Sequence, residues 1–475
     1  MKQIEQLKGI KKTMDSSFLD VQESKILGMI GLEIHTYLIT KEKLFCCCKA
    51  SREKGLQGNI NICPICSGQP GAKPMLPNEE AVKKAVLIAG MLGCKVNKYM
   101  PWQRKHYSWP DLPKGYQNTL SGSGAVPLGV EGKFKGIKIW SMHLEEDPAS
   151  WNPDTGEVDY NRSGLPLVEI ITAPEFSIAE EVMSWLQDLT HALAYLKCVD
   201  SNAGIKVDVN VNLPGKTERV EIKNLSSIEN IGKAIEYELS RQIKEGGKVK
   251  ETRRYDEAKN KTIVMRSKEA ADDYRFIRDP DLQSLSLNEK FISEIKNKVP
   301  EMPEVKLEKL IKKYKIDEKN AAILSTNIDI VEFFEKVADK IDVKLALPWV
   351  TGELLRFLNY NKKKLDEVDL KVEHFIALLD LVKSGKITPL KGKEILNKFY
   401  PKSFMPDVGE EGKIVDVKEL EKFAKLAISR NEKAVADYKS GLHGAINFLL
   451  GDMMKETKKR ADFKVAKEVL EKLLK

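Results

Sequence analysis

The segment 141–175 holds residues whose types and spacing suit catalysis. Three consecutive acids, at 145–147, follow His143, and a further acid, Glu169, lies inside an apolar run. That run, 165–171, predicts a mostly buried strand, and an ionised carboxylate in a buried strand is costly unless it is paired or bound to a metal. Glu169 therefore needs a partner.

The candidate partners are the acids at 145–147 and the segment 31–35. Glu33 and His35 lie two residues apart on a strand predicted over 25–38, so their side chains point to the same face. Several carboxylates that converge with one imidazole favour a hard cation, Mg²⁺ or Mn²⁺, of the kind used on phosphates. For any one of these acids, the alternative is an ordinary solvated or salt-bridged carboxylate.

A second group of candidate metal ligands is made of thiols. Five of the seven cysteines lie in one short segment, and in a reducing cytosol clustered thiols indicate a metal before a disulfide. Cys46 with Cys48, and Cys63 with Cys66, have the spacing of a four-thiolate Zn²⁺ knuckle, which leaves Cys47 as the spare thiol. Four protein ligands leave zinc no open position, so we expect a structural site; reduced structural thiols are the alternative.

A strand with one polar face is predicted over 205–213. Four polar residues alternate with apolar ones there, namely Lys206, Asp208, Asn210 and Asn212. The natural interpretation is a pocket wall, and the alternative is a solvated face. The next segment, 213–217, ends like a phosphate-binding loop, but position 210 holds Asn where that motif requires Gly, so we interpret it as a hairpin turn.

Basic residues suited to phosphate groups occur in three further places. The segment 102–117, interpreted as a loop, combines Lys105 and Tyr107 with two tryptophans, and could clamp phosphates and stack a base or form an interface. Arg254 and Arg266 lie near carboxylates, a combination suited to nucleotide phosphates. Four basic residues cluster near the end of the chain, where a solvated helix end is the alternative: Lys455, Lys458, Lys459 and Arg460.

Periodicity predicts three helices in the first half of the chain. They cover 78–93, with Asn78 as the cap, 177–197 and 226–245. Capping boxes from Ser177 to Glu180 and from Ser226 to Glu229 would open the last two helices.

The pattern as a whole predicts an α+β fold, because beyond Pro280 the chain turns to short helices rich in Lys, Leu and Glu. We expect an N-terminal antiparallel-sheet catalytic cradle domain with helices, then an all-helical domain and a small helical tail domain. The predicted segments are a flexible lead (1–25), the cradle with the zinc knuckle (26–295), the helical domain (296–405) and the tail (406–475).

Composition limits the class of protein. The chain has 475 residues, of which 42% are hydrophobic and 31% are charged, as in soluble proteins of several domains. It contains no run near the about 18 apolar residues of a membrane span and no apolar core of a signal peptide, so we expect a cytoplasmic protein without a membrane partner. The net charge of +8 permits a polyanionic partner without requiring one.

The motifs, in their order, closely resemble the B subunits of tRNA-dependent amidotransferases. The segments that carry this resemblance are GLEIH (31–35), CPIC (63–66), RKHY (104–107), HLEED (143–147), DYNRSGLPLVEI (159–170), EIKNL (221–225), ETRR (251–254), MRSKE (265–269) and DDYR (272–275). The closing ADYKSG and FLLGDMMK also resemble the family's tail. The related E subunits carry an aspartyl-tRNA-synthetase-like insertion that this chain lacks, which favours the B type.

This resemblance implies an ATP-dependent enzyme that acts on misacylated tRNA. ATP would phosphorylate the side-chain carboxylate of Glu on tRNA(Gln), or of Asp on tRNA(Asn), and ammonia would displace the phosphate. The ammonia would come from an amidase-type glutaminase partner, in a complex with a small third subunit; this chain itself has no Ser-Ser-Lys amidase signature. The alternative is a noncatalytic, zinc-containing tRNA-binding scaffold.

The resemblance also implies roles for individual residues. His35, Glu146 and Glu169 match the family's Mg²⁺ positions, with Glu33 beside them. The catalytic set is then Glu33, Lys105, Tyr107, Glu146 and Glu169, with nucleotide or phosphate binding by Lys206, Asp208, Asn210, Arg254 and Arg266. The cluster Lys455, Lys458, Lys459 and Arg460 would bind tRNA. Two positions depart from the family pattern: Gln103 replaces the usual Asp, and Lys206 replaces Arg.

Overall fold

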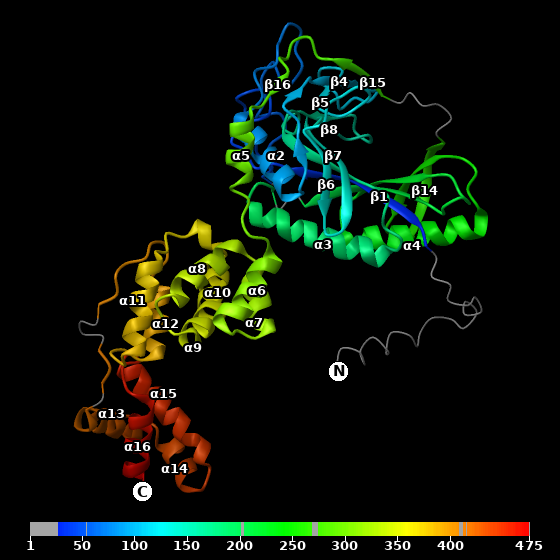
Figure 1. The fold of residues 1–475 in the computed structure, drawn as a ribbon. Coiled ribbons are helices and arrows are strands. Elements are labelled where there is room, and N and C mark those ends of the chain that lie inside the picture. Colours follow the sequence, from blue (N-terminus) through cyan, green and yellow to red (C-terminus); the bar gives the residue numbers. More distant parts are fainter. Residues whose placement is uncertain are drawn as a thin grey trace. The chain divides into compact units, whose positions relative to one another are not determined.

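The fold combines a sheet-based unit with a helical unit (Figure 1). The computed structural model describes residues 27–53, 55–200, 204–267, 274–407, 412–414 and 416–474, and the side chains of Arg266 and Ser267 are outside this description. The compact units are Met1–Pro300 and Glu301–Lys475. The flexible lead predicted over 1–25 lies outside the described residues.

The N-terminal unit is built on one large sheet. Its strands are β1 (Met29–Tyr37), β2 (Lys95–Val96), β4 (Gln103–His106), β5 (Gln117–Thr119), β6 (Gly129–Phe134), β7 (Ile137–Glu146), β10 (Pro166–Thr172), β11 (Ile205–Asn212), β12 (Val220–Leu225), β13 (Glu251–Asp256), β14 (Lys261–Ser267) and β15 (Arg275–Arg278). The main order is β14-β13-β12-β11-β1-β10-β7-β5-β4-β15, and β6 joins β2 to β7. The described pairs are antiparallel, as predicted, except for the parallel pair β12 and β13.

Two further pairs of short strands lie outside this sheet. They are β3 (Tyr99–Met100) with β16 (Leu285–Ser286), and β8 (Ser150–Trp151) with β9 (Val158–Asp159). The segment 102–117, predicted to be a loop, is instead strand, loop and strand, because β4 and β5 pair with each other. The turn predicted at 213–217 is confirmed, since it joins the antiparallel strands β11 and β12.

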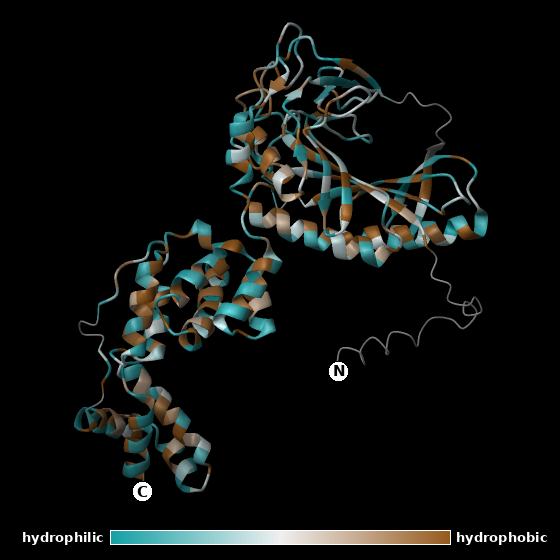
Figure 2. Cartoon of the chain, viewed as in Figure 1, coloured by the Kyte–Doolittle hydropathy of each residue, from teal (hydrophilic) through white to brown (hydrophobic). Residues whose placement is uncertain are grey.

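Alternation gives the large sheet two unlike faces. On β1, Ile30, Leu32 and Ile34 are buried, whereas Glu33 and His35 point to the other face. The apolar face packs on α3 (Ala179–Leu196) and α4 (Ile228–Glu245), which run along it (Figure 1). Figure 2 shows hydrophobic and hydrophilic residues interspersed along both helices, as expected when one stripe of a helix faces a core.

The helix starts differ in detail from the predictions. Asn78 caps α2 (Glu79–Met91) as predicted, accepting bonds from the backbone N–H groups of Glu80 and Ala81. The box predicted at Ser177 is wrong, because α3 begins after Ile178 and the Ser177 N–H donates to Glu181 Oε2 instead. The box predicted at Ser226 is displaced by one residue, because Ser227 caps α4.

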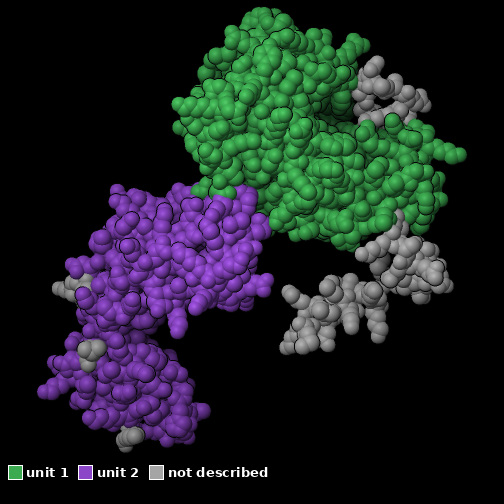
Figure 3. Space-filling model, in the orientation of Figure 1, with its two compact units in different colours: residues 1–300 green, residues 301–475 purple. Residues whose placement is uncertain are grey.

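The last helix of the N-terminal unit, α5 (Glu289–Lys296), packs on α2. Figure 3 colours the two units separately, and the C-terminal unit is built from helices. Its first part contains α6 (Pro303–Tyr314), α7 (Glu318–Ser325), α8 (Ile328–Ala338), α9 (Val343–Pro348), α10 (Leu355–Asn361), α11 (Val372–Lys383) and α12 (Pro389–Asn397). Its second part contains α13 (Val417–Arg430), α14 (Glu432–Lys439), α15 (Ile446–Glu456) and α16 (Phe463–Leu474). Each part has its own apolar core. Within the described ranges, no helix is both long and apolar enough to cross a membrane.

Candidate active site and metal centre

The polar face of the sheet brings Glu33, His35 and Glu169 together. His35 on β1 lies opposite Glu169 on β10, and its Nε2 atom is 3.5 Å from Glu169 Oε1 and 3.7 Å from Glu33 Oε1. One ligand atom from each of the three residues lies within 4.8 Å of the other two. The prediction that buried Glu169 needs a partner is confirmed, and His35 of the segment 31–35, one of the two candidate sources, is that partner.

Burial and mutual charge shift the pKa values of this cluster. Burial, together with the charge of Glu169, raises the pKa of Glu33 to about 8. Burial opposes protonation of His35, but a hydrogen bond to Glu169 and its charge raise the pKa of His35 to about 9. Burial likewise opposes ionisation of Glu169, yet His35 holds the pKa of this carboxyl well below its usual range. At neutral pH the metal-free cluster thus carries protons on Glu33 and His35.

The donor set fits a divalent cation. The Oε2 atom of Glu169 is buried and has no hydrogen-bond partner, and an unsatisfied buried carboxylate oxygen is costly unless something else compensates it. Two carboxylates and an imidazole are ligands that Mg²⁺ and Mn²⁺ accept. Glu33, His35 and Glu169 are therefore the residues that would hold such an ion.

We predict that the affinity of this cluster for Mn²⁺ rises steeply with pH. The cation must displace protons from Glu33 and His35, whose pKa values are about 8 and about 9. The association constant should then increase by up to about a hundredfold per pH unit below pH 8 and level off above pH 9. Titration with Mn²⁺ between pH 6 and 9, followed by electron paramagnetic resonance, measures this. Glu33→Gln should reduce the slope, and a pH-independent affinity would contradict the prediction.

Further groups on the same face surround Glu169. His143 on β7 lies opposite it, with Nε2 3.9 Å from Glu169 Oε2, while its Nδ1 atom lies 2.8 Å from the carbonyl of Leu120. Because a carbonyl only accepts, Nδ1 carries a proton. Glu145 is also buried on this face, where Thr119 Oγ1 and Gln117 Nε2 donate to its carboxylate. The sequence reasoning did not single out Glu145, because only the pairing of β7 with β10 shows that Glu145 shares a face with Glu169.

Lys105 on β4 reaches the same group of acids. Burial opposes its charge, but Glu145 and Glu169 raise the pKa of Lys105 above its ordinary value. Its Nζ atom lies 4.7 Å from the centre of the Tyr274 ring. The Tyr107 ring also packs edge-on against Tyr274, with 5.7 Å between the centroids. The structure therefore places Lys105 at the cluster and Tyr107 beside it through a shared aromatic neighbour.

The structure does not bring Glu146 to this cluster, which corrects its predicted place beside Glu169. Successive residues of a strand point to opposite faces, so Glu146 points away from the face of Glu145. Its Oε1 atom accepts from Lys114 Nζ and from the backbone N–H of Asn118, at 2.9 Å for the latter. Glu146 thus anchors the loop between β4 and β5.

The polar side of β11 continues the same face. Lys206 lies opposite His35 in the register, Asp208 opposite Glu33, and Asn210 opposite Gly31. The predicted alternation is confirmed, since the apolar residues at 207, 209 and 211 are fully buried. The Lys206 Nζ atom lies 3.4 Å from Tyr37 Oη, and Asp208 accepts from Lys223 Nζ at 2.9 Å.

The two arginines assigned to phosphate binding lie on the edge hairpin of the sheet. Arg254 on β13 is exposed and lies opposite Lys223. The backbone of Arg266 on β14 pairs with Thr252, while its side chain falls outside the described part of the chain.

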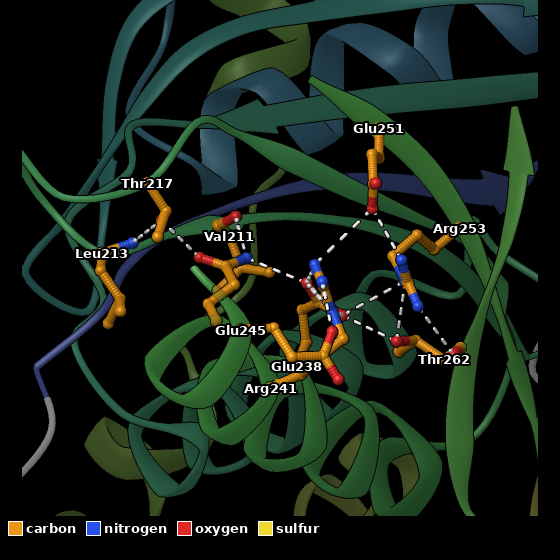
Figure 4. Close-up of polar contacts among 10 residues, drawn as sticks. Val211, Leu213, Thr217, Glu238, Arg241, Glu245, Glu251, Arg253 and Thr262 are labelled. Atoms are coloured by element: carbon orange, nitrogen blue, oxygen red, sulfur yellow. Dashed lines mark hydrogen bonds and ion pairs between the residues drawn. The ribbon is translucent and has the colours of Figure 1, made fainter. Parts of the chain in front are cut away.

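The neighbouring Arg253 has a structural role instead (Figure 4). Its guanidinium contacts Glu251 at 2.6 Å and fully buried Glu238 of α4 at 3.5 Å. Arg241 binds the same Glu238 carboxylate at 2.6 Å, and Thr262 Oγ1 donates to it at 2.7 Å. The network fastens the hairpin of β13 and β14 to α4.

The four thiols predicted to bind zinc converge. Ligand atoms of Cys46, Cys48, Cys63 and Cys66 all lie within 4.8 Å of one another. Cys66 Sγ is 3.9 Å from the sulfurs of both Cys48 and Cys63, near the about 3.8 Å expected between thiolates around a tetrahedral Zn²⁺. Cys47 is exposed and lies outside the group, as predicted. The arrangement is compatible with a closed zinc site.

The basic cluster near the end of the chain is divided in two. Lys455 and Lys458 are exposed. Lys459 pairs with Glu394 of α12 at 2.6 Å, and its carbonyl accepts from Thr388 Oγ1. The carbonyl of Arg460 accepts from the N–H of Ile414 at 2.9 Å. Two of the four predicted tRNA-binding residues thus also join parts of the helical unit.

Known proteins are similar to this chain over almost its full length. A family model described as the GatB/GatE catalytic domain matches residues 28–293, and one described as the GatB domain matches residues 332–474. The chain is 43% identical over 465 residues to the B subunit of the aspartyl/glutamyl-tRNA(Asn/Gln) amidotransferase of Methanocaldococcus jannaschii. That alignment covers 94% of this chain and 97% of the methanogen protein.

The protein of the same name from Methanobrevibacter smithii is 40% identical over 457 residues, covering 93% of this chain and 100% of that protein. The one from Methanothermobacter thermautotrophicus is 40% identical over 442 residues, covering 91% and 97%. The resemblance carried by the motifs is confirmed, and the chain belongs to the family of amidotransferase B subunits.

Proposed function

We propose that this chain is the kinase and transamidase component of a tRNA-dependent amidotransferase. It would use ATP to phosphorylate the side-chain carboxylate of Glu-tRNA(Gln), Asp-tRNA(Asn) or both, and then amidate it with ammonia. The observation that carries the proposal is the cluster of Glu33, His35 and Glu169 beside Lys105, in a chain whose relatives are named for this amidotransferase.

The residues on the polar face have distinct tasks in this proposal. A Mg²⁺ ion held by Glu33, His35 and Glu169 would neutralise phosphate charge. Lys105 supplies a fixed cation beside it, and Tyr107 packs against Tyr274, the aromatic neighbour of Lys105. Nucleotide and phosphate contacts come from Lys206, Asp208, Asn210, Arg254 and Arg266. Burial opposes the charge of Lys105, but the charges of Glu145 and Glu169 outweigh it and raise the pKa of Lys105. Lys105 therefore stays protonated, so it stabilises negative charge and does not act as a base.

The proposed amidation requires a source of ammonia, and the proposed partners supply it. The ammonia would come from an amidase-type glutaminase, in a complex with a small third subunit. The four thiolates of the knuckle would bind a structural Zn²⁺, which adds folding free energy and takes no part in the reaction. We place the complex in the cytoplasm, where charged tRNA is available.

Assay of the assembled complex with Glu-tRNA(Gln) and Asp-tRNA(Asn) in turn tests the proposal. We expect ATP hydrolysis that depends on the misacylated tRNA, with Gln-tRNA(Gln) or Asn-tRNA(Asn) as the product when glutamine is supplied. Uncharged tRNA and correctly charged Gln-tRNA(Gln) serve as controls. ATP hydrolysis that is indifferent to the amino acid on the tRNA would favour the noncatalytic scaffold.

We predict that the helical tail contributes to tRNA affinity through phosphate contacts. Deletion of residues 413–475 should raise KM for charged tRNA severalfold at low salt, because each lost phosphate contact removes a counterion-release contribution. Lys455→Ala with Lys458→Ala should reproduce part of this rise, since both side chains are exposed. The effect should shrink as salt increases, and glutamine hydrolysis by the partner should remain. Equal KM values for full-length and truncated complexes at low salt would contradict the prediction.

A further inference from the structure

Lys43 is a buried cation without a carboxylate. It lies in the loop after β1, its side chain is only 1% exposed, and it is among the largest fully buried side chains of the described chain. Its Nζ atom has two polar neighbours, Cys66 Sγ at 3.4 Å and the carbonyl of Tyr160 at 3.1 Å. Among the described residues, no acid lies within ion-pair distance of it.

A buried ammonium of this kind requires a nearby negative charge, because removing it from water costs several kcal/mol. Four neutral thiols would not supply that charge. Four thiolates around one Zn²⁺ do, since the complex keeps a net negative charge after the metal is counted. Cys66 is also the thiol that accepts the backbone N–H of Cys63 at 3.2 Å. Cys66 Sγ therefore accepts hydrogen bonds from both the Lys43 ammonium and the backbone N–H of Cys63.

We infer that Lys43 is the counter-cation of the four-thiolate centre and links it to the turn 159–164. This rests on the proposal that the thiolates bind zinc and is independent of the amidotransferase activity. A positive charge inside the knuckle offsets the electrostatic repulsion among the four thiolates and so lowers the free energy needed to bring them together. Lys43 thus positions the metal ligands and itself binds no metal.

The turn 159–164 is bonded to the loop between Cys48 and Cys63, where Asn161 Oδ1 accepts from the backbone N–H groups of Ile60 and Asn61. Three further contacts are made by Lys43, its neighbour Leu44 and the metal ligand Cys66. Lys43 donates to the Tyr160 carbonyl, Ser163 Oγ donates to the Cys66 carbonyl at 2.7 Å, and the Leu44 N–H donates to the Gly164 carbonyl at 2.8 Å. The same turn carries Arg162, whose Nε atom lies 3.1 Å from Asp147 Oδ2. Tyr37 at the end of β1 donates to that same oxygen at 3.0 Å. Loss of the metal should therefore loosen the turn that holds Arg162 against Asp147.

Zinc affinity of the purified full-length protein tests the charge. Lys43→Met keeps the length and burial of the side chain and removes the cation; it should weaken zinc binding at least tenfold in competition with a chromogenic chelator. Lys49→Met is the matched control, because Lys49 lies in the same loop but is exposed and pairs with Glu53 at 3.0 Å. It should bind zinc as the wild type does. Equal affinity in Lys43→Met and Lys49→Met would overturn the inference, whereas absence of zinc binding by the wild type would overturn the zinc proposal itself.

A second pair of variants covers the case in which Lys43→Met does not fold. Lys43→Arg keeps the charge, and Lys43→Gln keeps an N–H donor without it. We expect Lys43→Arg to retain zinc and Lys43→Gln to lose zinc affinity; the reverse order, or equal losses, would overturn the inference.

Hydrogen exchange tests the link between the four-thiolate centre and the turn 159–164. Amides of 159–165 should exchange at least tenfold faster in zinc-free wild type and in the Gln variant, while those of α4 should not change. Unchanged exchange in 159–165 would overturn the link to the turn.

Discussion

Replacement of Glu169 by Gln should abolish phosphorylation of the tRNA-bound carboxylate. Glu169 is the buried carboxylate of the cluster that stays ionised, since His35 holds its pKa low, and its Oε2 atom has no hydrogen-bond partner. The amide supplies one weaker ligand oxygen and no charge. We expect tRNA-dependent ATP hydrolysis to fall at least about a thousandfold, or by about 4 kcal/mol of transition-state stabilisation. Single-turnover assays with the assembled complex measure this loss.

Two matched Glu→Gln variants show whether the loss of ATP hydrolysis is specific to a carboxylate on the face of the sheet that carries the cluster. Glu175→Gln removes a carboxylate that pairs with Lys138 at 2.9 Å, away from the cluster, and should leave the rate unchanged. Glu146→Gln removes an acid on the opposite face of β7, where Lys114 and Asn118 hold it, and should leave Mn²⁺ affinity unchanged. More than a tenth of wild-type activity in Glu169→Gln would sink the proposed metal site. So would a loss of Mn²⁺ affinity in Glu146→Gln equal to that in Glu169→Gln.

Lys105→Met should reduce kcat about a hundredfold, or by about 2.7 kcal/mol, with a much smaller change in the KM for ATP. A fixed ammonium beside the acids can stabilise charge that develops during transfer, and Met fills the same space without charge. Glu145 and Glu169 raise the pKa of Lys105, so Lys105 stays protonated through the neutral range. The ratio of the wild-type kcat to the kcat of Lys105→Met should therefore not change with pH in that range.

The controls for Lys105 separate charge from packing. Lys98→Met removes an exposed lysine that pairs with Glu289 at 2.6 Å and should have wild-type activity. Lys105→Arg should recover part of the rate if positive charge is what matters. Thermal unfolding of each variant shows whether Glu145 and Glu169 tolerate the loss of their neighbour. An increase in the KM for ATP at unchanged kcat would instead assign Lys105 to ground-state binding.

The sequence alone predicts those features of the fold and the site that depend on a local pattern of residues. The alternation in 205–212 predicts β11 because its period is that of a strand. The thiol spacing predicts which four cysteines converge, since C-x-C and C-x-x-C turns fix the sulfurs within a few residues. The need of Glu169 for a partner follows from burial alone, and His35 meets it.

The remaining features depend on contacts between distant segments. Three consecutive acids do not reveal which of them faces inward, and only the pairing of β7 with β10 selects Glu145 over Glu146. Adjacent serines at 226 and 227 offer two equivalent caps until the helix docks. Lys43 has no sequence signal at all, because its burial is created by a turn more than a hundred residues away in the chain, at Tyr160.

The parallel pair of β12 and β13 has a consequence for folding. These strands run in the same direction and are joined through α4, as parallel strands require a long crossover connection. We therefore expect the hairpin that carries Arg254 to pair with the sheet only after α4 has docked, and the contacts of buried Glu238 with Arg241 and Arg253 to be completed at the same step. Because such non-local pairing is slow, this edge of the sheet should be among the last parts of the unit to form.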